Sequence, residues 1–567
     1  MLPDLLADLI TGAVAAAQSA GDLPTVPLPA IAVTRPKQAD KGDFSCALAL
    51  QLARPVNDAL TAAGKARLTP VQIAAAIAAR LPESPCIERV EVAAPGFVNI
   101  FLSPLWLAQQ AGEIAALGAG WFRPAVAAPA RVQVEFVSAN PTGPLHFGGA
   151  RNAAIGDTLA RLLEAAGAEV QREYYINDRG AQVDIFAATL WRRYQQLFGL
   201  DVSIPADGYP GAYMIDYAGA IQTELGDSLL PLTDSEAIPI FRRLGLSLVM
   251  AELADDLGRM AVFFDSWFSE QSLYDDGTFQ QVGDILRQQG DLYEKEGATW
   301  FLASKYLPKS ERDEVFIRSN GEPGYYASDI AYHYHKLVTR SFDRVVDVWA
   351  VDHQNQAARM PAMMKALGLD PGRLAIVIYD LVTLKRGGVE VKISKRQGEI
   401  ITMREVLDEV GPDAARFLLL NHSNEARIDF DLDLAVAQSS ENPVYYVQYA
   451  HARVASILRK AAEQGLDFSR ADLTLLVHPA EQMLLAKMLQ LPETIAEAVR
   501  HLAPHHLPHY ALDLAKTFTA FYDACRVLSG DPADAAITLA RLTLVQAFKI
   551  TLAHLLDLMG MSAPEVM

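Results

Sequence analysis

The segment from Val132 to Ile176 constrains the fold of this chain more than any other. It starts with alternating β-branched and polar side chains (132–137), which predict a strand. Asn-Pro, Thr-Gly-Pro and Gly-Gly follow and favour turns. Apolar residues then recur at helical spacing over 150–166, before a second strand candidate at 169–176. This order predicts a βαβ unit whose glycine-rich turn brings His146 and free backbone amides to a helix N-terminus, which suits phosphate.

The size and charge of the chain limit what it can be. With 567 residues it is too long for one hydrophobic core, so we expect three or four domains. A formal net charge of −19 argues against a protein that coats nucleic acid, but an enzyme can still grip nucleic acid through local basic patches. The three cysteines are widely spaced and predict buried thiols in a reducing cytoplasm. No apolar run of ~18 residues and no basic N-terminal leader is found, so we expect a cytoplasmic protein without a membrane segment.

The predicted fold class is α/β plus all-α, in three units. Residues 1–112 combine helices with a strand pair and predict an α/β N-terminal domain. Residues 131–435 alternate strands and helices, which predicts a doubly wound, Rossmann-type domain. A polar segment at about 198–297 is interpreted as an insertion, after which we expect the parallel sheet to resume with 315–318 and 345–350. Residues 436–567 have helical periodicity and predict a helical bundle.

Two motifs carry the chemistry, and each is weak by itself. The turn His146–Gly149 is of a common kind, and a lone histidine is more often structural. The segment Lys392–Lys395 is most simply a basic surface loop. Together, however, they flank the two halves of a predicted parallel sheet, and this arrangement resembles the signature of class I aminoacyl-tRNA synthetases. In that class the two motifs hold ATP from opposite sides.

Longer runs make the resemblance specific. Residues 135–146 (Glu-Phe-Val-Ser-Ala-Asn-Pro-Thr-Gly-Pro-Leu-His) are close to the form found in arginyl-tRNA synthetases, as is 392–396 continuing into 406–417. Residues 442–453 resemble the helical anticodon-binding domain of that family. Residues 42–45 and 95–101, together with their surroundings, resemble its additional N-terminal domain. The chain is therefore identified as a member of the bacterial-type arginyl-tRNA synthetases.

The resemblance implies an arginine–tRNA ligase for protein synthesis. Such an enzyme activates L-arginine with ATP to arginyl-adenylate and transfers it to the 3′-terminal adenosine of tRNA(Arg), first to the ribose 2′-hydroxyl. It releases AMP and pyrophosphate. The resemblance further implies that bound tRNA is needed for activation, that Mg²⁺ accompanies ATP, that the N-terminal domain binds the tRNA corner and that the protein is a monomer.

The motif matches also imply site residues, with no side chains dedicated to a metal. The expected catalytic residues are His146, Lys392 and Lys395. The expected ATP-binding residues are Pro141, Thr142, Gly143, His146, Gly148, Gly149, Asp352, His353, Lys392, Ser394 and Lys395. The expected arginine-binding residues are Glu135, Ser138, Asn140, His146, Tyr325, Asp329 and Gln354. The expected tRNA-binding residues are Tyr446, Tyr449 and Arg453.

The chemistry explains why these residue types are needed. A carboxylate is already a nucleophile, so activation needs positioning and charge stabilisation rather than a general base. The guanidinium of arginine is best recognised by a carboxylate, because a bidentate pair reads its planar fork. Tyr325 and Asp329 stand four residues apart at a predicted helix start, so they point the same way. Tyr446, Tyr449 and Arg453 share one helix face, where they could stack on anticodon bases or form part of a core.

Three positions depart from the family pattern. Gly149 replaces a second histidine, Ala350 stands where the family more often has glycine, and Val566 replaces a common arginine. The first departure keeps open a catalytically weakened, tRNA-binding paralogue that acts as a regulator. A further alternative is a class I ligase or nucleotidyltransferase that does not use tRNA. The intact lysine loop and arginine pocket argue against the former, and the helical C-terminal third argues against the latter.

Overall fold

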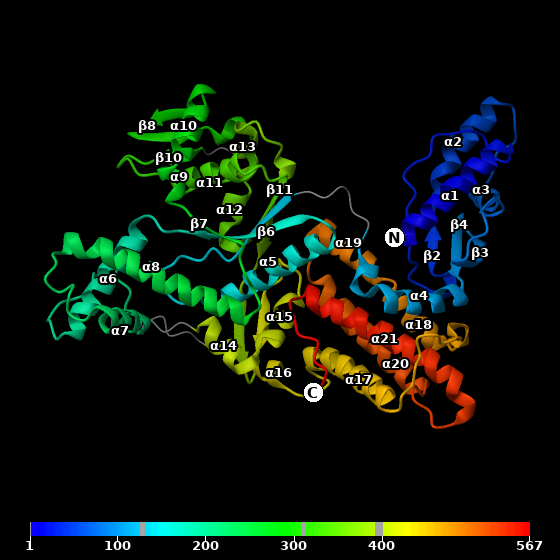
Figure 1. Cartoon of the computed structure of the whole chain (residues 1–567). Coiled ribbons are helices and arrows are strands. Elements are labelled where there is room, and N and C mark those ends of the chain that lie inside the picture. Colours follow the sequence, from blue (N-terminus) through cyan, green and yellow to red (C-terminus); the bar gives the residue numbers. More distant parts are fainter. Residues whose placement is uncertain (1, 125–130, 308–312, 392–400) are drawn as a thin grey trace.

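The molecule is elongated and built from three parts in a row (Figure 1). The structure, a computed structural model, describes residues 2–124, 131–307, 313–391 and 401–567. The N-terminal part lies at one end, and a parallel sheet with its inserted helices lies at the other. A helical bundle joins the two. The predicted combination of α/β and all-α parts is confirmed.

A five-stranded parallel sheet forms the centre of the second part. Its order is β12-β11-β5-β6-β7. β5 (Arg131–Glu135), α5 (Phe147–Ala165) and β6 (Glu169–Ile176) form the predicted βαβ unit. β11 (Arg344–Ala350) adds to the other side of β5, and β12 (Leu374–Tyr379) follows. The direction of winding reverses between β5 and β11, which is where doubly wound sheets bind ligands.

The prediction that the parallel sheet resumes after the insertion is confirmed for 345–350, which lie in β11, and is wrong for 315–318. β7 (Ser266–Ser269) lies inside the expected insertion, yet it pairs in parallel with β6 as the edge strand. The ring of Trp267 in β7 stacks on the ring of Tyr174 in β6, with 4.7 Å between the ring centroids. β10 (Glu314–Ile317) instead pairs antiparallel with β9 (Ala298–Phe301), next to β8 (Leu292–Lys295), in a separate sheet. Short aromatic strands of four residues are hard to distinguish from loops by pattern alone.

The remaining helices of this part surround the sheet. Those inserted between β6 and β7 form the arm at the left of Figure 1: α6 (Ala181–Leu197), α7 (Tyr213–Leu225) and α8 (Asp234–Arg259). Those that pack with the small antiparallel sheet and the second half of the parallel sheet are α9 (Ser272–Asp275), α10 (Thr278–Gln288), α11 (Tyr325–Tyr334), α12 (Gln354–Ala357) and α13 (Met360–Ala366).

The N-terminal part contains the predicted helices and strand pair. Its antiparallel sheet has the order β1-β2-β4-β3. Its elements are α1 (Leu2–Ser19), β1 (Val33–Thr34), β2 (Phe44–Cys46), α2 (Leu48–Ala62), α3 (Pro70–Ala78), β3 (Ile87–Ala93) and β4 (Phe97–Leu102). The next helix, α4 (Pro104–Leu117), packs on the C-terminal bundle, where Gln482 donates a hydrogen bond to the Pro104 carbonyl at 3.3 Å. The three cysteines are buried free thiols, as predicted.

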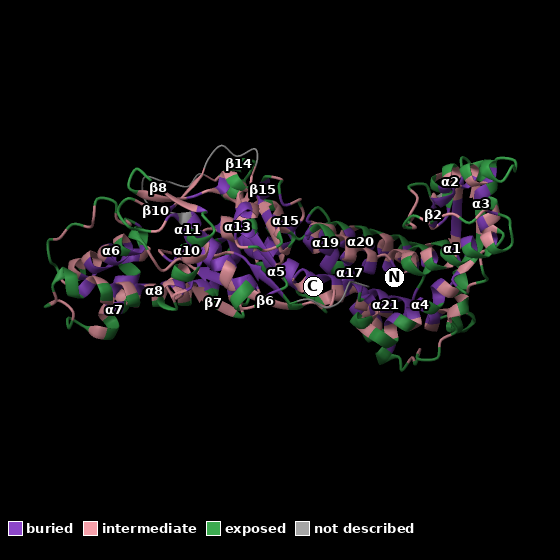
Figure 2. Ribbon diagram, turned by 90° about the horizontal axis from the view of Figure 1, so that it is seen from above, coloured by how far each residue is buried: buried purple, intermediate pink, exposed green. Residues whose placement is uncertain are grey.

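The C-terminal third is a helical bundle preceded by a small mixed sheet. That sheet comprises β13 (Val382–Arg386), β14 (Val389–Glu390) and β15 (Ile428–Asp431). The helices are α14 (Met403–Val410), α15 (Pro412–Leu420), α16 (Leu432–Val436), α17 (Pro443–Glu463), α18 (Pro479–Met488), α19 (Leu491–His501), α20 (His506–Ala524) and α21 (Ala535–Leu558). Buried residues run through the sheet and along the bundle (Figure 2).

One helix of the bundle is unusually apolar. Within the described part of the chain, Pro532–Leu558 is the single helical stretch long and apolar enough to cross a membrane, with a mean hydropathy of 1.4. It contains α21, which packs against α4, α17 and α20. Thirteen of its residues are buried in the protein, from Thr538 to Leu558. The apolar composition of α21 is therefore used by the core of the bundle.

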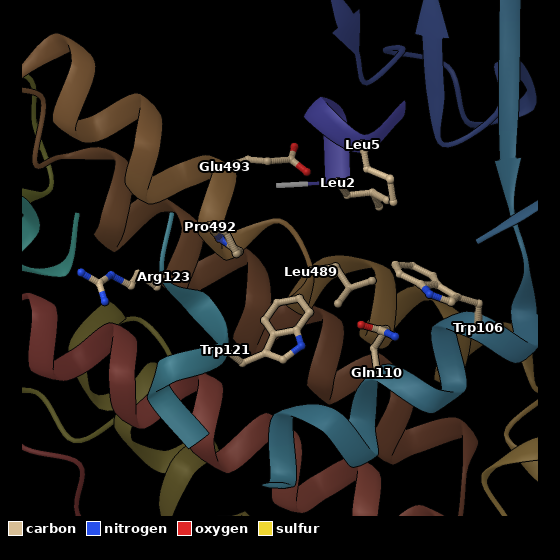
Figure 3. A pocket seen from close by; sticks show the side chains of 9 residues that line it. All are labelled: Leu2, Leu5, Trp106, Gln110, Trp121, Arg123, Leu489, Pro492 and Glu493. Carbon is tan, nitrogen blue, oxygen red and sulfur yellow. The ribbon is translucent and has the colours of Figure 1, made fainter. Parts of the chain in front are cut away.

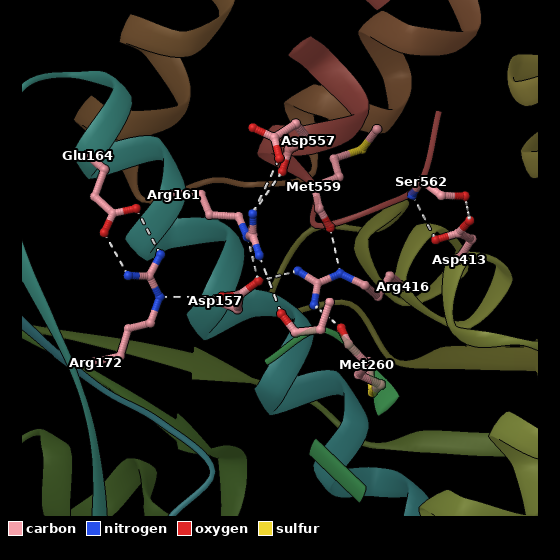
Figure 4. Close-up of polar contacts among 11 residues, drawn as sticks. Asp157, Arg161, Glu164, Arg172, Met260, Asp413, Arg416, Asp557, Met559 and Ser562 are labelled. Carbon is pink, nitrogen blue, oxygen red and sulfur yellow. Dashed lines mark hydrogen bonds and ion pairs between the residues drawn. The ribbon is translucent and has the colours of Figure 1, made fainter. Parts of the chain in front are cut away.

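A buried ion pair joins the parallel sheet region to the bundle (Figure 4). Arg416 of α15 donates to Asp157 of α5 at 2.5 Å, and both side chains are almost fully buried. The same guanidinium donates to the carbonyls of Met559 at 2.5 Å and Met260 at 2.8 Å. Burial opposes the charge of Asp157, but Arg416 and Arg161 outweigh it and lower the pKa of this carboxyl. Every nitrogen of Arg416 thus has an acceptor.

We expect Arg416→Leu to destabilise the protein strongly. The substitution removes one partner of a buried pair and leaves two carbonyls without a donor, so the free energy of unfolding should fall by about 3 kcal/mol. Urea denaturation followed by tryptophan fluorescence measures the loss. The matched control is Arg500→Leu, which removes an exposed pair with Glu497 and should cost less than about 1 kcal/mol. Equal small losses in both variants would contradict the role of Arg416.

Candidate active site

The chain leaves β5 through a strained turn. Val137 and Ser138 have φ angles of +67° and +43°, a region that L-residues rarely adopt and that is costly for a β-branched side chain. Asn152 of α5 holds the turn in place: its Oδ1 accepts from the Val137 amide at 2.7 Å, and its Nδ2 donates to the Val348 carbonyl of β11 at 2.9 Å. Strained backbone that is fixed by its surroundings is typical of functional sites.

His146 caps the N-terminus of α5. Its Nδ1 accepts a hydrogen bond from the Gly148 amide at 2.9 Å. Burial lowers the pKa of His146, so the ring is neutral at pH 7. Because Nδ1 is an acceptor, the proton lies on Nε2, which is left as a donor. The turn therefore presents an imidazole N–H beside the positive end of a helix dipole.

A side chain at either of the two glycines, Gly148 and Gly149, would meet a neighbouring side chain. A Cβ on Gly148 would lie 3.1 Å from Nδ1 of His146, and a Cβ on Gly149 would lie 2.7 Å from Cδ1 of Leu145. In the same turn, a Cβ on Gly143 would lie 2.9 Å from the Tyr213 ring of α7. The space that a second histidine would need at position 149 is thus occupied by Leu145, a flexible side chain.

The segment after the predicted lysine loop is bound to this turn. The Phe147 amide donates to the Ile401 carbonyl at 3.2 Å, and the Met403 amide donates to the Leu145 carbonyl at 2.7 Å. Thr402 then starts α14 with a capping box that includes Glu405. The expected ATP-binding residues of the loop, which lie outside the described residues, are Lys392, Ser394 and Lys395.

A buried network of charges lies at the carboxyl end of β5. Lys336 donates to Glu135 at 2.6 Å and to Asp347 of β11 at 2.9 Å. His333 contacts the other oxygen of Asp347 at 2.7 Å. Although burial opposes the charge, Lys336 and His333 hold the pKa of Asp347 at about 2. Ser138 donates to the remaining oxygen of Glu135 at 2.9 Å, so that Glu135 is fully engaged in this structure.

Asp329 lies beside this network, and no lysine or arginine of the described residues forms an ion pair with it. It is on α11, one turn after Tyr325, which begins the helix as expected. Gln356 donates to its carboxylate. Burial raises the pKa of Asp329 to about 7, and the nearby carboxylates of Glu135 and Glu270 add to the rise. A partly buried carboxyl with such a pKa is suited to bind a cationic group from outside.

The other expected substrate residues lie at the ends of neighbouring strands. Asn140 contacts Asn177 and Gln182 at 3.0 and 2.9 Å, between β5 and α5, where Pro141 and Thr142 follow it. The turn after β11 carries three exposed residues that the resemblance assigns to substrates, namely Asp352, His353 and Gln354. All of these are at the carboxyl edge of the sheet.

Sequence reasoning missed Lys336, Gln356 and Asn152. Asp329, His333 and Lys336 recur at helical spacing, which could have indicated one shared face. Nothing local distinguishes Gln356 from Gln354, because the choice depends on how the turn after β11 runs. Lys336 also lies in a π-helical turn, His335–Thr339, of a kind often found at functional sites.

The expected RNA-binding residues of α17 separate into two environments. The Tyr446 hydroxyl contacts Thr519 of α20 at 3.0 Å, and its ring packs against the core. Tyr449 is exposed, and the Arg453 guanidinium lies 5.0 Å from its ring and 4.6 Å from the ring of Tyr522. The surface cluster is therefore formed by Tyr449, Arg453 and Tyr522, while Tyr446 supports it from within.

The edge of the sheet thus combines two kinds of recognition. The N-terminus of α5 offers an imidazole donor and helix amides, which favour phosphate. Asp329 offers a carboxylate, which favours a cation. Asp329 lies near Glu135 at the end of β5, and the turn that carries His146 leaves the same strand. Such a site can hold an anionic nucleotide and a cationic substrate side by side.

Known proteins match the whole chain. Three family models match in succession: the arginyl tRNA synthetase N terminal domain over residues 4–102, the tRNA synthetases class I (R) catalytic domain over 117–454, and the DALR anticodon binding domain over 447–567. The arginine–tRNA ligase of Dehalococcoides mccartyi (strain CBDB1) is 44% identical over 566 residues, covering 100% of this chain and 99% of its own. That of Heliobacterium modesticaldum is 44% identical and covers 98% of each.

Solved structures agree with this result. The arginyl-tRNA synthetase of Thermus thermophilus has a TM-score of 0.74 and 26% identity, with 100% of both chains covered. The folds match over all three parts, the sequence identity extends over the full length, and the catalytic family model spans more than half of the residues. This chain belongs to the arginyl-tRNA synthetase family.

Proposed function

We propose that this ATP-dependent arginine–tRNA ligase forms arginyl-adenylate at the carboxyl edge of its five-stranded sheet, between the N-terminus of α5 and Asp329. The observation that supports this assignment best is the pairing of a neutral His146 donor with a raised-pKa carboxyl at one strand end. The arginine carboxylate attacks the α-phosphorus of ATP and pyrophosphate leaves. The protein positions the two reactants and stabilises charge.

ATP binds over the turn between β5 and α5 in this proposal. Nε2 of His146 and the amides near Gly148 and Gly149 donate to phosphate oxygens, while Pro141, Thr142 and Gly143 shape the turn. Asp352 and His353, exposed at the end of β11, contact the nucleotide from the second half of the sheet. Lys392, Ser394 and Lys395 neutralise the leaving pyrophosphate. The described residues contain no cluster of three or more metal-ligating side chains, and Mg²⁺ arrives bound to ATP.

Arginine binds with its guanidinium against Asp329 and Tyr325. Gln356 already holds one oxygen of Asp329 and so fixes the carboxylate plane. Ser138, Asn140 and Gln354 contact the amino acid at the strand ends. Glu135, kept in place by Lys336, adds negative potential to the pocket.

The same proposal includes the organisation of the chain. The N-terminal domain (1–112) and the helical domain (436–567) bind tRNA, and the Rossmann-type domain (131–435) catalyses both steps. Tyr449 and Arg453 offer stacking faces to anticodon bases, and Tyr446 holds them in place. The enzyme acts as a monomer in the cytoplasm, without a membrane.

ATP–pyrophosphate exchange tests the activity and its dependence on tRNA. We expect exchange with arginine when tRNA(Arg) is present, little exchange with lysine, and none without tRNA. Canavanine, which keeps the planar fork, is the matched analogue and should support exchange more weakly. Tight tRNA binding without any exchange would instead support a regulatory paralogue.

We expect His146→Ala to slow activation by ~10²–10³-fold, because a preorganised donor to the phosphoryl group is lost. Pre-steady-state adenylate formation measures this rate, and filter binding checks that the affinity for tRNA is unchanged. His478→Ala is the matched control, since His478 caps α18 in the same way and accepts from the Ala480 amide at 3.2 Å. Near-normal activation in His146→Ala would refute the assignment.

Arginine binding should depend on the protonation of Asp329. Its pKa is about 7 in the free enzyme, and only the ionised form pairs with a guanidinium. The Kd for arginine should therefore be flat above pH 7 and rise about tenfold per pH unit below it. Isothermal titration calorimetry from pH 5.5 to 8.5 measures the profile.

Asp329→Asn should bind arginine weakly at every pH and lose this slope. Asp370→Asn, an exposed carboxylate that caps a short turn before β12, should keep the wild-type profile. A pH profile that survives in Asp329→Asn would assign the titration to another group.

A further inference from the structure

Arg151 is a fully buried cation close to the start of α5. It lies on the same helix as the cap formed by His146, about 7.5 Å further along the axis. Burial lowers the pKa of Arg151 to about 10, so the guanidinium is still charged at pH 7. A buried charge is costly unless its surroundings compensate for it, so its contacts indicate what it does.

The guanidinium of Arg151 joins two segments that are far apart in the sequence. Nη1 donates to the Asp380 carbonyl at 2.5 Å, and Nη2 donates to the Ser423 carbonyl at 2.9 Å. Asp380 lies between β12 and β13, whereas Ser423 lies between α15 and β15. No carboxylate of the described residues forms an ion pair with Arg151, although Asp380 and Glu425 are near enough to favour its charge. Its contacts therefore hold backbone segments in place.

The second of these segments also holds the bundle. We call residues 421–424 the joint segment, because they follow the last turn of α15 and contact two helices of the bundle. Nδ2 of Asn424, a buried side chain, donates to the Leu502 carbonyl at the end of α19 at 3.0 Å. Nε2 of His509, in α20, donates to the Asn421 carbonyl at 2.9 Å. The guanidinium thus connects α5 to the segment that positions α19 and α20.

α19 extends this connection to the N-terminal part of the molecule. At the start of the helix, Glu493 pairs with Arg35 at 2.8 and 2.9 Å. Pro492 and Glu493 line a cavity of about 300 Å³ at this contact (Figure 3). At the other end, the Leu502 carbonyl is held by Asn424, and the helix packs against α5. One helix therefore spans the distance from the N-terminal part to the joint segment.

Two other side chains fix α5, but neither connects its first turns to the bundle. Asp157 pairs with Arg416 three turns beyond His146, roughly 17 Å along the axis. Asn152 holds the turn after β5 and the end of β11, both of which belong to the sheet. Arg151 supplies a connection to the bundle close to the N-terminus of the helix, where the imidazole lies.

We propose that Arg151 is a positioning residue for the activation step, because it sets the first turns of α5, and with them His146, relative to the joint segment. The inference rests on the proposed role of His146 in adenylate formation. The N-terminal part and the bundle both reach the joint segment, through α19 and α20, and α20 carries Tyr522 of the surface cluster. The arrangement of the two parts proposed to bind tRNA is thereby coupled to the phosphate site.

The test compares the rate of adenylate formation with the affinity for substrates. Arg151→Met should slow pre-steady-state adenylate formation at saturating arginine, ATP and tRNA(Arg) by ~10²-fold, because a displacement of about 1 Å at the reacting groups costs that much. The Kd for tRNA and the KM for arginine should stay at their wild-type values. Arg151→Lys keeps the charge but lacks the fork that holds two carbonyls, so it should recover only part of the rate.

A second variant tests the connection from the other side. Asn424→Ala leaves α5 unchanged but releases the Leu502 carbonyl, and it should also slow adenylate formation. Combined with Arg151→Met, it should cause no further loss, because both substitutions break the same connection. The matched control is Arg161→Met, on the same helix, which removes a pair with Asp157 and a contact with α21 and should keep the wild-type rate. Circular dichroism melting checks that each variant is folded.

The possible outcomes separate this inference from the proposed function. Wild-type adenylate formation in folded Arg151→Met would overturn the inference and leave the proposed function intact. An equal loss in Arg161→Met would also overturn it, since the effect would then be a general loosening of α5. Should Arg151→Met not fold, a wild-type rate in Asn424→Ala would overturn it. Absence of arginine-dependent exchange in the wild-type enzyme would refute the proposed function, and this inference with it.

Discussion

The contact between Asp157 and Arg416 is the interaction on which the arrangement of this enzyme depends. α5 carries His146 at its N-terminus and Asp157 further along, so the helix that His146 caps is also the one fixed by Arg416. The two residues are 259 positions apart in sequence and almost fully buried. A buried pair of this kind contributes less to net stability than to the choice of one arrangement, because any alternative leaves charges unpaired. Here the selected arrangement is the packing of α5 against the bundle.

The carboxylates Asp157 and Asp329 have different electrostatic surroundings. Around Asp157 every charge is matched, with Arg161, Arg172 and Arg416 present. At the carboxyl edge of the sheet, burial and the nearby carboxylates of Glu135 and Glu270 raise the pKa of Asp329. One carboxyl beside the network thus has a raised pKa, whereas the deeper carboxylates are paired. Lys336 pairs with the deeper carboxylates, Glu135 and Asp347.

Features of the fold that depend on residues close together in the sequence could be predicted, and features that depend on distant residues could not. The βαβ unit and the cap formed by His146 depend on residues within one segment, and both agree with the predicted elements. β7 and β10 were misplaced because a strand of four residues takes its partner from the tertiary fold. Sequence reasoning missed Lys336, Gln356 and Asn152 for the same reason. Each forms its contacts with another element, and the sequence does not show which elements are neighbours in the fold. Matching to a family supplied Asp329 and the lysine loop, which no local pattern would have selected. The buried, clustered charge around Asp329 could be described only once the elements were packed.

The carbonyl of Met559 has a consequence for the way this chain is made. Arg416 needs that carbonyl to complete its set of acceptors, and the two residues are 143 positions apart. Domains form from the N-terminus onward during synthesis. A nascent chain can therefore form the sheet and α5 while the guanidinium of Arg416 still lacks one of its three acceptors, the Met559 carbonyl. Met559 is synthesised only after nearly all of the bundle has been translated. The full fixing of α5 thus becomes a late event in biosynthesis, and in chains that stop before residue 559 the Nε of Arg416 lacks the acceptor that it has in the complete fold.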